Sequence, residues 1–194
     1  PNSILPHDGR FGCGTSLIRP DAVRQLAHSP RLGTSHRQAP VKDLVARVQA
    51  MLAEHLGLPE GYEIALGVGG STAFWDVATF SLVQRRATHG VFGEFGNSFY
   101  KETHSAPFLK RSIAVTAEPG SCAVPEGTEK GDVFAWPQNE TSTGVIAPVT
   151  RITDDALIVI DATSAAGGVE VDLSQTDVYY FAPQKCFASD GGLW

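Results

Sequence analysis

Cysteine is scarce in this sequence, and long apolar runs are missing. The 194 residues include three cysteines, Cys13, Cys122 and Cys186, which have neither the density of a disulfide scaffold nor the paired spacing of a zinc site. No apolar stretch reaches the roughly 18 residues that a membrane-spanning helix needs. The first residues lack a basic region followed by an apolar one, so we expect no signal peptide and a reducing, cytoplasmic location.

Positive charge is also in short supply. Lys and Arg total 15 against 21 Asp and Glu, which gives a formal net charge of -6, and the basic residues form no cluster in the sequence. This balance argues against a nucleic-acid-binding surface. Hydrophobic residues make up 42% of the chain, which is enough for a substantial core, and the length favours about one domain.

Predicted helices and strands alternate along the chain. A helix is predicted over 40–56, because apolar residues recur there at helical spacing, Pro40 suits the first turn and Gly57 suits the end. Two more helices are predicted over 72–84 and 94–103. Strands are predicted over 62–66, 88–92, 112–116, 133–136, 156–160 and 178–181.

The run 156–160 is apolar throughout, which is typical of a central parallel strand that is buried on both faces. Strands that alternate with helices predict a three-layer α/β/α fold with a mostly parallel sheet. Ligands of such sheets bind beyond the carboxyl ends of the strands. Gly70, Phe95, Asp161 and Lys185 all lie at or just after predicted strand ends, so we expect them at one edge of the sheet.

Lys185 follows the apolar run 178–181 and precedes small and polar residues. A lysine in this position can offer its amine to an aldehyde cofactor as a Schiff base. The segment Gly69-Gly70-Ser71-Thr72 joins a predicted strand to a predicted helix, and the free N–H groups of a helix N-terminus suit a phosphate. The alternative for this segment is an ordinary tight turn.

Three further residues each allow a cofactor role and a plain structural one. Asp161 suits a protonated pyridine nitrogen, or else it caps the following helix. Phe95 suits stacking on a flat ring, or else it belongs to the core. Thr141 suits a cofactor hydroxyl or phosphate, or else it lies in a polar turn.

Arg37 and His36 precede the first predicted helix. Arginine in a loop is suited to bidentate capture of a carboxylate or a phosphate, and His36 suits a phosphate group. The alternative is a solvated loop. The histidines show no metal-ligand spacing, so we expect no metal site.

Together these segments resemble the pyridoxal-phosphate aminotransferases of the aspartate aminotransferase fold (fold type I). More narrowly, they resemble the class V phosphoserine aminotransferases of the actinobacterial type. The resemblance runs over nearly the whole chain. Its motifs are FGCGTS (11–16), GTSHRQAP (33–40), GGSTAFWD (69–76), NETSTG (139–144), DATS (161–164) and FAPQK (181–185).

The resemblance implies a role for each candidate around the cofactor. Lys185 holds pyridoxal 5'-phosphate and moves the substrate proton, while Asp161 pairs with the ring nitrogen. Gly70 and Ser71 bind the cofactor phosphate, with help from Gln184.

For the remaining candidates the resemblance also implies roles. Phe95 stacks on the cofactor ring, where many relatives carry tryptophan. Thr141 contacts the region of the cofactor 3-hydroxyl. Arg37 binds the substrate carboxylate, and His36 contacts the phosphate of the substrate.

The implied reaction exchanges an amino group between L-glutamate and 3-phosphohydroxypyruvate, giving O-phospho-L-serine and 2-oxoglutarate. This reaction serves serine biosynthesis, and in some family members pyridoxine biosynthesis. The resemblance also implies a homodimer. Family members are near twice this length, so we expect 1–194 to hold the N-terminal segment and most of the large domain. A strand beginning around Gly192 and the small C-terminal domain are expected beyond it, and the isolated segment is expected to be inactive.

Two alternatives remain at this point. One is another class V enzyme, either an alanine-glyoxylate type aminotransferase or a desulfurase. The other is a non-catalytic protein on the same scaffold, which the joint presence of Lys185 and Asp161 disfavours.

Overall fold

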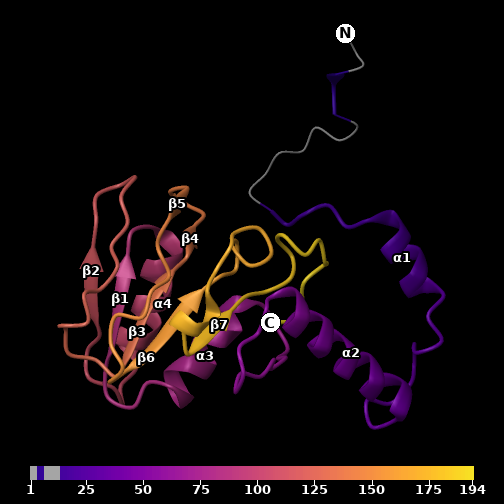
Figure 1. The fold of residues 1–194 in the computed structure, drawn as a ribbon, viewed down its shortest axis with the longest axis horizontal. Helices are drawn as coiled ribbons and strands as arrows, with labels where there is room; N and C mark the ends of the chain where they lie inside the picture. Colours follow the sequence, from indigo (N-terminus) through magenta and orange to yellow (C-terminus); the bar gives the residue numbers. More distant parts are fainter. Residues whose placement is uncertain (1–3, 7–13) are drawn as a thin grey trace.

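A five-stranded parallel sheet forms the centre of the computed structural model, which describes residues 4–6 and 14–194 (Figure 1). The strand order is β2-β1-β3-β6-β7, and every neighbouring pair is parallel. Five of the six predicted strands are confirmed to within one residue at each end, as is the predicted α/β fold class. The strands are β1 (Ala87–Val91), β2 (Ile113–Thr116), β3 (Val133–Pro137), β6 (Leu157–Asp161) and β7 (Val178–Tyr180).

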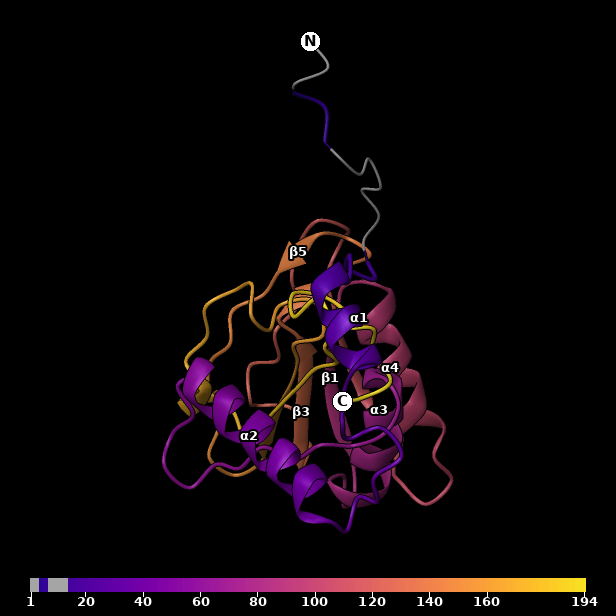
Figure 2. The same ribbon diagram turned by 90° about the vertical axis from the view of Figure 1, so that its right-hand side faces the viewer.

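Side chains of the central strands alternate between two apolar layers, as the period of a strand requires. Ala135 and Val159 face one layer, and Phe134 and Ile158 face the other. Helices α3 (Ser71–Ser81) and α4 (Glu94–Ser105) supply the rest of the first layer and lie on the same side of the sheet (Figure 2). Loop segments cover the second layer with partly buried side chains, among them Val124, Val149 and Ile152.

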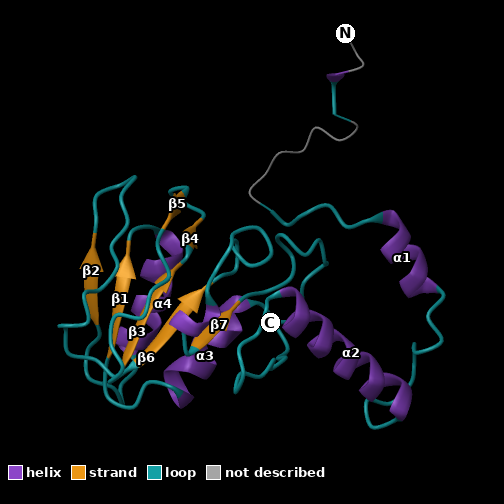
Figure 3. Cartoon of the chain, viewed as in Figure 1, coloured by secondary structure: helices purple, strands orange, loops and turns teal. Residues whose placement is uncertain are grey.

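The predicted helices over 40–56, 72–84 and 94–103 are confirmed as α2 (Ala39–His55), α3 and α4. Helix α1 (Pro20–Ala27) was not predicted, because only a few apolar residues mark its short length. Helices α1 and α2 both lie beyond the β7 edge of the sheet (Figures 1 and 3). None of the helices in the described part of the chain has the length and apolar character to cross a membrane.

The strand predicted over 62–66 is wrong. Only Val68 pairs there, in a single antiparallel bridge with Leu193, supported by the Gly67 N–H to the Trp194 carbonyl at 2.8 Å and by the reverse bond at 2.9 Å. A strand needs a partner along its length, and the described backbone offers a partner only around Gly67 and Val68. Leu193 forms only this isolated bridge, so the strand expected to begin around Gly192 stays a prediction.

A short hairpin lies at the carboxyl side of the sheet. Strands β4 (Asn139–Glu140) and β5 (Val145–Ile146) form this antiparallel hairpin directly after β3, whereas η2 (Leu173–Gln175) is a 3₁₀ turn that leads into the amino end of β7. The hairpin carries the 139–144 motif, so this motif lies close to the ends of β3 and β6.

His89 is a buried polar residue within β1, 1% exposed. Its Nε2 lies 2.7 Å from the Thr103 hydroxyl, which in turn lies 2.8 Å from the Ser112 hydroxyl. Burial disfavours the charged imidazolium and lowers the pKa of His89 from 6.5 to about 3. The folded protein therefore holds this imidazole neutral where an unfolded chain would bind a proton.

We expect acid to destabilise the fold through His89. Its folded pKa lies below its unfolded one, so its contribution to stability is lost as pH falls from about 6.5 towards 3. In His89→Gln the free energy of unfolding should depend on pH less steeply than in the wild type, by up to about 1.4 kcal/mol per pH unit. Urea unfolding of both proteins at several pH values measures this difference. Parallel pH profiles would contradict it.

Candidate active site

The candidate site lies at the carboxyl edge of the sheet, where the loops after β1, β3, β6 and β7 meet. In a parallel sheet these ends share one edge, so residues distant in the sequence converge there. Asp161 is the last residue of β6, and Lys185 follows β7. The N-terminus of α4 follows β1, and the β4-β5 hairpin follows β3.

Asp161 is buried and held by three donors. It accepts hydrogen bonds from the Thr163 N–H (2.9 Å) and the Thr163 hydroxyl (2.6 Å), and its carboxyl group also hydrogen-bonds the Tyr180 side chain. The Trp75 indole N–H donates to the Tyr180 hydroxyl at 2.8 Å, which fixes that ring. Burial raises the pKa of Asp161, and the hydrogen bonds from Thr163 oppose this effect. A protonated ring nitrogen beside this carboxylate would supply the missing positive charge.

Ser71 is joined to Asp161 through one residue. The Thr163 hydroxyl lies 2.6 Å from the Ser71 hydroxyl as well as from Asp161. Ser71 is also the first residue of α3, so this contact places the N-terminus of that helix beside the end of β6.

The turn before α3 fits a phosphate. Gly69 has a φ of +109°, and a Cβ there would lie 2.9 Å from the Cβ of Ala73, so only glycine suits the position. A Cβ on Gly70 would meet no atom within 4 Å, so there is open space in front of the helix. Among the described side chains, none accepts a hydrogen bond from the N–H of Ser71 or Thr72. These free donors and the positive end of the helix dipole suit an anion.

Lys185 lies against the N-terminal segment. A Cβ on Gly14 would stand 2.8 Å from both the Cδ and the Nζ of Lys185, so the side chain passes directly over this glycine. The neighbouring Gln184 carbonyl accepts the N–H (2.8 Å) and the hydroxyl (3.0 Å) of Ser16. The Gln184 side-chain oxygen is buried and has no hydrogen-bond partner within the described residues. A buried, unsatisfied amide beside Lys185 fits a polar ligand at this place.

Phe95 and Asp161 line the same small cavity. Phe95 is the second residue of α4 and is 43% exposed, and Pro137 and Tyr180 complete the walls. A half-exposed ring beside the buried carboxylate of Asp161 fits a stacking face and does not fit a core residue.

Thr141 connects the hairpin to the loop after β6. Its hydroxyl donates to the Ser164 hydroxyl at 2.7 Å, and the Asn139 amide donates to the same oxygen at 2.8 Å. Ser164 lies three residues after Asp161, so these bonds place Thr141 near that carboxylate. Thr141 lies in the turn between β4 and β5, and this turn is close to Asp161. The two interpretations of Thr141, as a turn residue and as a residue near the cofactor, are therefore compatible.

Arg37 and His36 stand apart from this group. Both side chains are exposed in the loop between α1 and α2, where the Arg37 N–H donates to the Ser35 hydroxyl at 3.2 Å. None of the recorded hydrogen bonds or ion pairs of the described chain joins either residue to the site, and α1 and α2 lie beyond β7 (Figure 1). Their substrate roles stay predictions.

Of the 11–16 motif, residues 11–13 lie outside the described residues. The described part of the chain contains no cluster of side chains able to hold a metal ion.

Glu140 is the residue that sequence reasoning missed. It is fully buried, yet its carboxylate accepts hydrogen bonds from the Gly96 N–H (2.9 Å), the Phe95 N–H (3.4 Å), and the Ser142 N–H (3.2 Å) and hydroxyl (2.7 Å). Glu140 thereby caps the first turn of α4 from a different element. A Cβ on Gly93 would lie 2.3 Å from its Cγ, so the glycine makes room for it. The only sequence signal was a charged residue in a run of small polar ones.

We expect Glu140→Gln to destabilise the protein by about 1–3 kcal/mol, because buried donors of α4 lose a charged acceptor. Glu94→Gln is the matched control, since Glu94 is exposed in the first turn of the same helix and should cost less than about 1 kcal/mol. Urea unfolding of the three proteins measures both effects. Equal losses in the two variants would show that the buried cap is unimportant.

Solved structures that resemble this chain include aminotransferases. The chain matches a phosphoserine aminotransferase from Cytophaga hutchinsonii with a TM-score of 0.83 at 25% identity, covering 93% of this chain and 52% of that one. It matches the ureidoglycine-glyoxylate aminotransferase of Bacillus subtilis with a TM-score of 0.80 at 21% identity, covering 98% of this chain and 52% of that one. The second match speaks for the fold alone.

Sequence comparison gives a narrower result. The family model Aminotransferase class-V matches residues 126–192. The chain is 54% identical to a phosphoserine aminotransferase of Nocardioides sp. (strain ATCC BAA-499 / JS614), over all of this chain and 54% of that protein. It is 54% identical to a putative phosphoserine aminotransferase of Mycobacterium leprae (strain TN), over all of this chain and 53% of that protein. The chain thus spans about half the length of the curated relatives it matches, and its residues 126–192 are similar to the class V aminotransferase family.

Proposed function

We propose that the protein containing this chain is a phosphoserine aminotransferase, which moves an amino group between L-glutamate and 3-phosphohydroxypyruvate with pyridoxal 5'-phosphate as cofactor. One observation carries the proposal. Direct hydrogen bonds connect Asp161, through Thr163, to Ser71 at the N-terminus of α3, within a chain that resembles phosphoserine aminotransferases over its whole length. A buried carboxylate next to an anion-binding helix end suits a cofactor that has a basic ring nitrogen and a phosphate.

When bound, pyridoxal phosphate supplies an electron sink for the α-carbon of the substrate. Asp161 would hold a proton on the ring nitrogen, and Phe95 would cover one face of the ring. The free N–H groups at Ser71 would bind the phosphate, and Thr141 would contact the ring's oxygen substituent. Lys185 would hold the cofactor through its Nζ, and the same amine would take the proton from the substrate and return it.

Substrate binding falls to the loop between α1 and α2. Arg37 has an exposed guanidinium that is suited to a carboxylate, and the exposed imidazole of His36, its neighbour in sequence, is suited to a phosphate group. These roles rest on the resemblance of the 33–40 segment. The part of the protein that completes the site around them would come from the small C-terminal domain and from the second subunit of a homodimer.

The wider context belongs to the same proposal. The reaction would serve serine biosynthesis, and the same reaction on a phosphorylated 2-oxo acid related to threonine would serve pyridoxine biosynthesis. The proposed location is the cytoplasm, which the three scattered cysteines favour. The 1–194 segment would then supply the N-terminal segment and most of the cofactor-binding large domain.

In the full-length protein we expect Lys185 to be the residue that holds the cofactor covalently. Borohydride reduction should fix the cofactor to the peptide that contains Lys185, as mass spectrometry of a digest would show. Lys185→Ala should lose this modification and nearly all transaminase activity. Lys101→Ala, an exposed lysine on α4, is the control and should keep both. Modification of a different lysine would exclude the assigned role.

We expect kcat/KM for glutamate with 3-phosphohydroxypyruvate to exceed that for alanine with glyoxylate by on the order of 100-fold. Arg37→Gln should lower kcat/KM for the phosphorylated substrate by at least about tenfold, because a charged hydrogen bond to the substrate is lost. Arg24→Gln, an exposed arginine on α1, should leave it unchanged. A preference for alanine and glyoxylate would favour the other class V assignment.

A further inference from the structure

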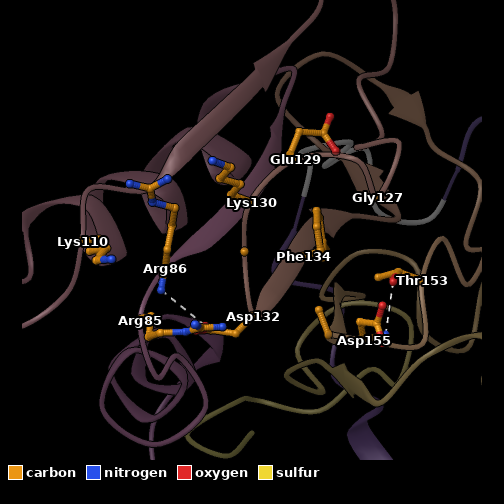
Figure 4. Close-up of a pocket in the computed structure, with 12 residues that line it drawn as sticks. Arg85, Arg86, Lys110, Gly127, Glu129, Lys130, Asp132, Phe134, Thr153 and Asp155 are labelled. Carbon is orange, nitrogen blue, oxygen red and sulfur yellow. Dashed lines mark hydrogen bonds and ion pairs between the residues drawn. The ribbon is translucent and has the colours of Figure 1, made fainter.

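A second pocket lies at the opposite, amino-terminal edge of the sheet (Figure 4). Its volume is about 580 Å³, within the range of small-molecule sites. Its walls come from the segments that precede β1, β2, β3 and β6. Its charged side chains are Arg85, Arg86, Lys110, Lys130, Asp132 and Asp155, together with Glu129. We call it the amino-edge pocket.

Asp132 is already fully engaged. It forms an ion pair with the Arg85 guanidinium (Nε to Oδ2, 3.3 Å) and accepts the backbone N–H groups of Gln84 (3.3 Å) and Arg86 (3.4 Å). Arg85 is therefore neutralised, and Asp132 has little capacity left for a second cation. Both oxygens of Glu129 accept from the Glu126 N–H, which orients this carboxylate and leaves its negative charge in place.

The other three cations of the amino-edge pocket lack such compensation. Within the described residues no ion pair is recorded for Arg86, Lys110 or Lys130. Lys110 and Lys130 are exposed, and Arg86 is half-buried. Figure 4 shows the Arg86 guanidinium and the Lys130 amine on the same side of the pocket. Like charges held together repel, and an anion between them relieves the repulsion.

Besides the unpaired cations of the described chain, a buried nitrogen of Arg86 also indicates a ligand site. Its Nε is buried and has no hydrogen-bond partner among the described residues. A buried donor that stays unsatisfied is unfavourable, so native structures normally provide it with an acceptor. The protein provides none here, although the guanidinium borders an open pocket. In this conformation Nε is closed to solvent, so a ligand oxygen reaches it only when the Arg86 side chain shifts towards the pocket.

We propose that the amino-edge pocket binds the phosphate group of a small phosphorylated metabolite. A doubly charged phosphate matches two or three uncompensated cations better than a single carboxylate does, and its oxygens can take a fork of hydrogen bonds from Arg86. Asp155 lies on the far side of the pocket from Arg86 and Lys130, and Glu129 lies next to Lys130 (Figure 4); both carboxylates suit hydroxyl or ammonium donors on the rest of the ligand. The ligand binds at the edge of the sheet opposite Lys185, so it acts as a stabilising or regulatory ligand and does not enter the reaction.

Thermal unfolding of the full-length protein loaded with cofactor tests the proposal, with inorganic phosphate as the probe and chloride to match ionic strength. Phosphate should raise the midpoint temperature of the wild type in a saturable way. Arg86→Gln and Lys130→Gln should each weaken the apparent affinity for phosphate by at least about tenfold. Lys130→Gln changes an exposed side chain, so it reports on binding even where Arg86→Gln folds poorly.

The control is Lys101→Gln, which removes an equal charge from the exposed face of α4 and should leave the phosphate response intact. Phosphate also suits the proposed substrate site, so the decisive quantity is the part of the response that Lys130→Gln removes. A phosphate response that is the same in the wild type and in Lys130→Gln would overturn the proposal. So would a wild type that responds to phosphate no more than to chloride. Loss of transaminase activity alone would bear only on the proposed function.

Discussion

The parallel pairing of β3 with β6 is the constraint on which the other parts of this structure depend. Both strands are apolar and almost wholly buried, and their register ends with Pro137 beside Asp161. Because the strands run in the same direction, the hairpin after β3 and the loop after β6 leave the sheet at the same level. Thr141 and Ser164 can therefore meet at 2.7 Å although 23 positions separate them.

The candidate active site is stabilised by polar groups that are buried but satisfied. Glu140 gives its carboxylate to the N–H groups of α4, and Asp161 takes bonds from Thr163 and Tyr180. Such groups are costly to bury and costly to lose, so they fix the positions of their partners. Through Glu140, the first turn of α4 holds Phe95 at the cavity that contains Asp161.

The two edges of the sheet suit different ligands. Helix N-termini with their N–H donors lie at the carboxyl edge, and basic side chains gather at the amino edge. At the carboxyl edge, the N-termini of α3 and α4 point their donors towards the site, and Glu140 uses those of α4 while those of α3 stay open. At the amino edge, arginine and lysine side chains precede the strands and only part of their charge is neutralised within the chain. A net charge of -6 hides this local cluster, because the residues are dispersed in sequence and gathered by the fold.

Local pattern in the sequence determined the elements that depend on nearby residues. Apolar runs predicted β1, β2, β3, β6 and β7, helical spacing predicted α2, and strand ends predicted the edge at which Asp161 and Lys185 lie. The structure decided what depends on distant partners. Residues 62–66 have strand-like composition yet lack a partner along their length, and the polar run around Glu140 concealed a helix cap that serves residues 44 and 45 positions away. The same holds for Arg86, whose unsatisfied Nε appears only once β1, β3 and β6 are side by side. The sequence encodes periodicity over a few residues, whereas hydrogen-bond satisfaction and charge compensation are set by the folding of the whole chain.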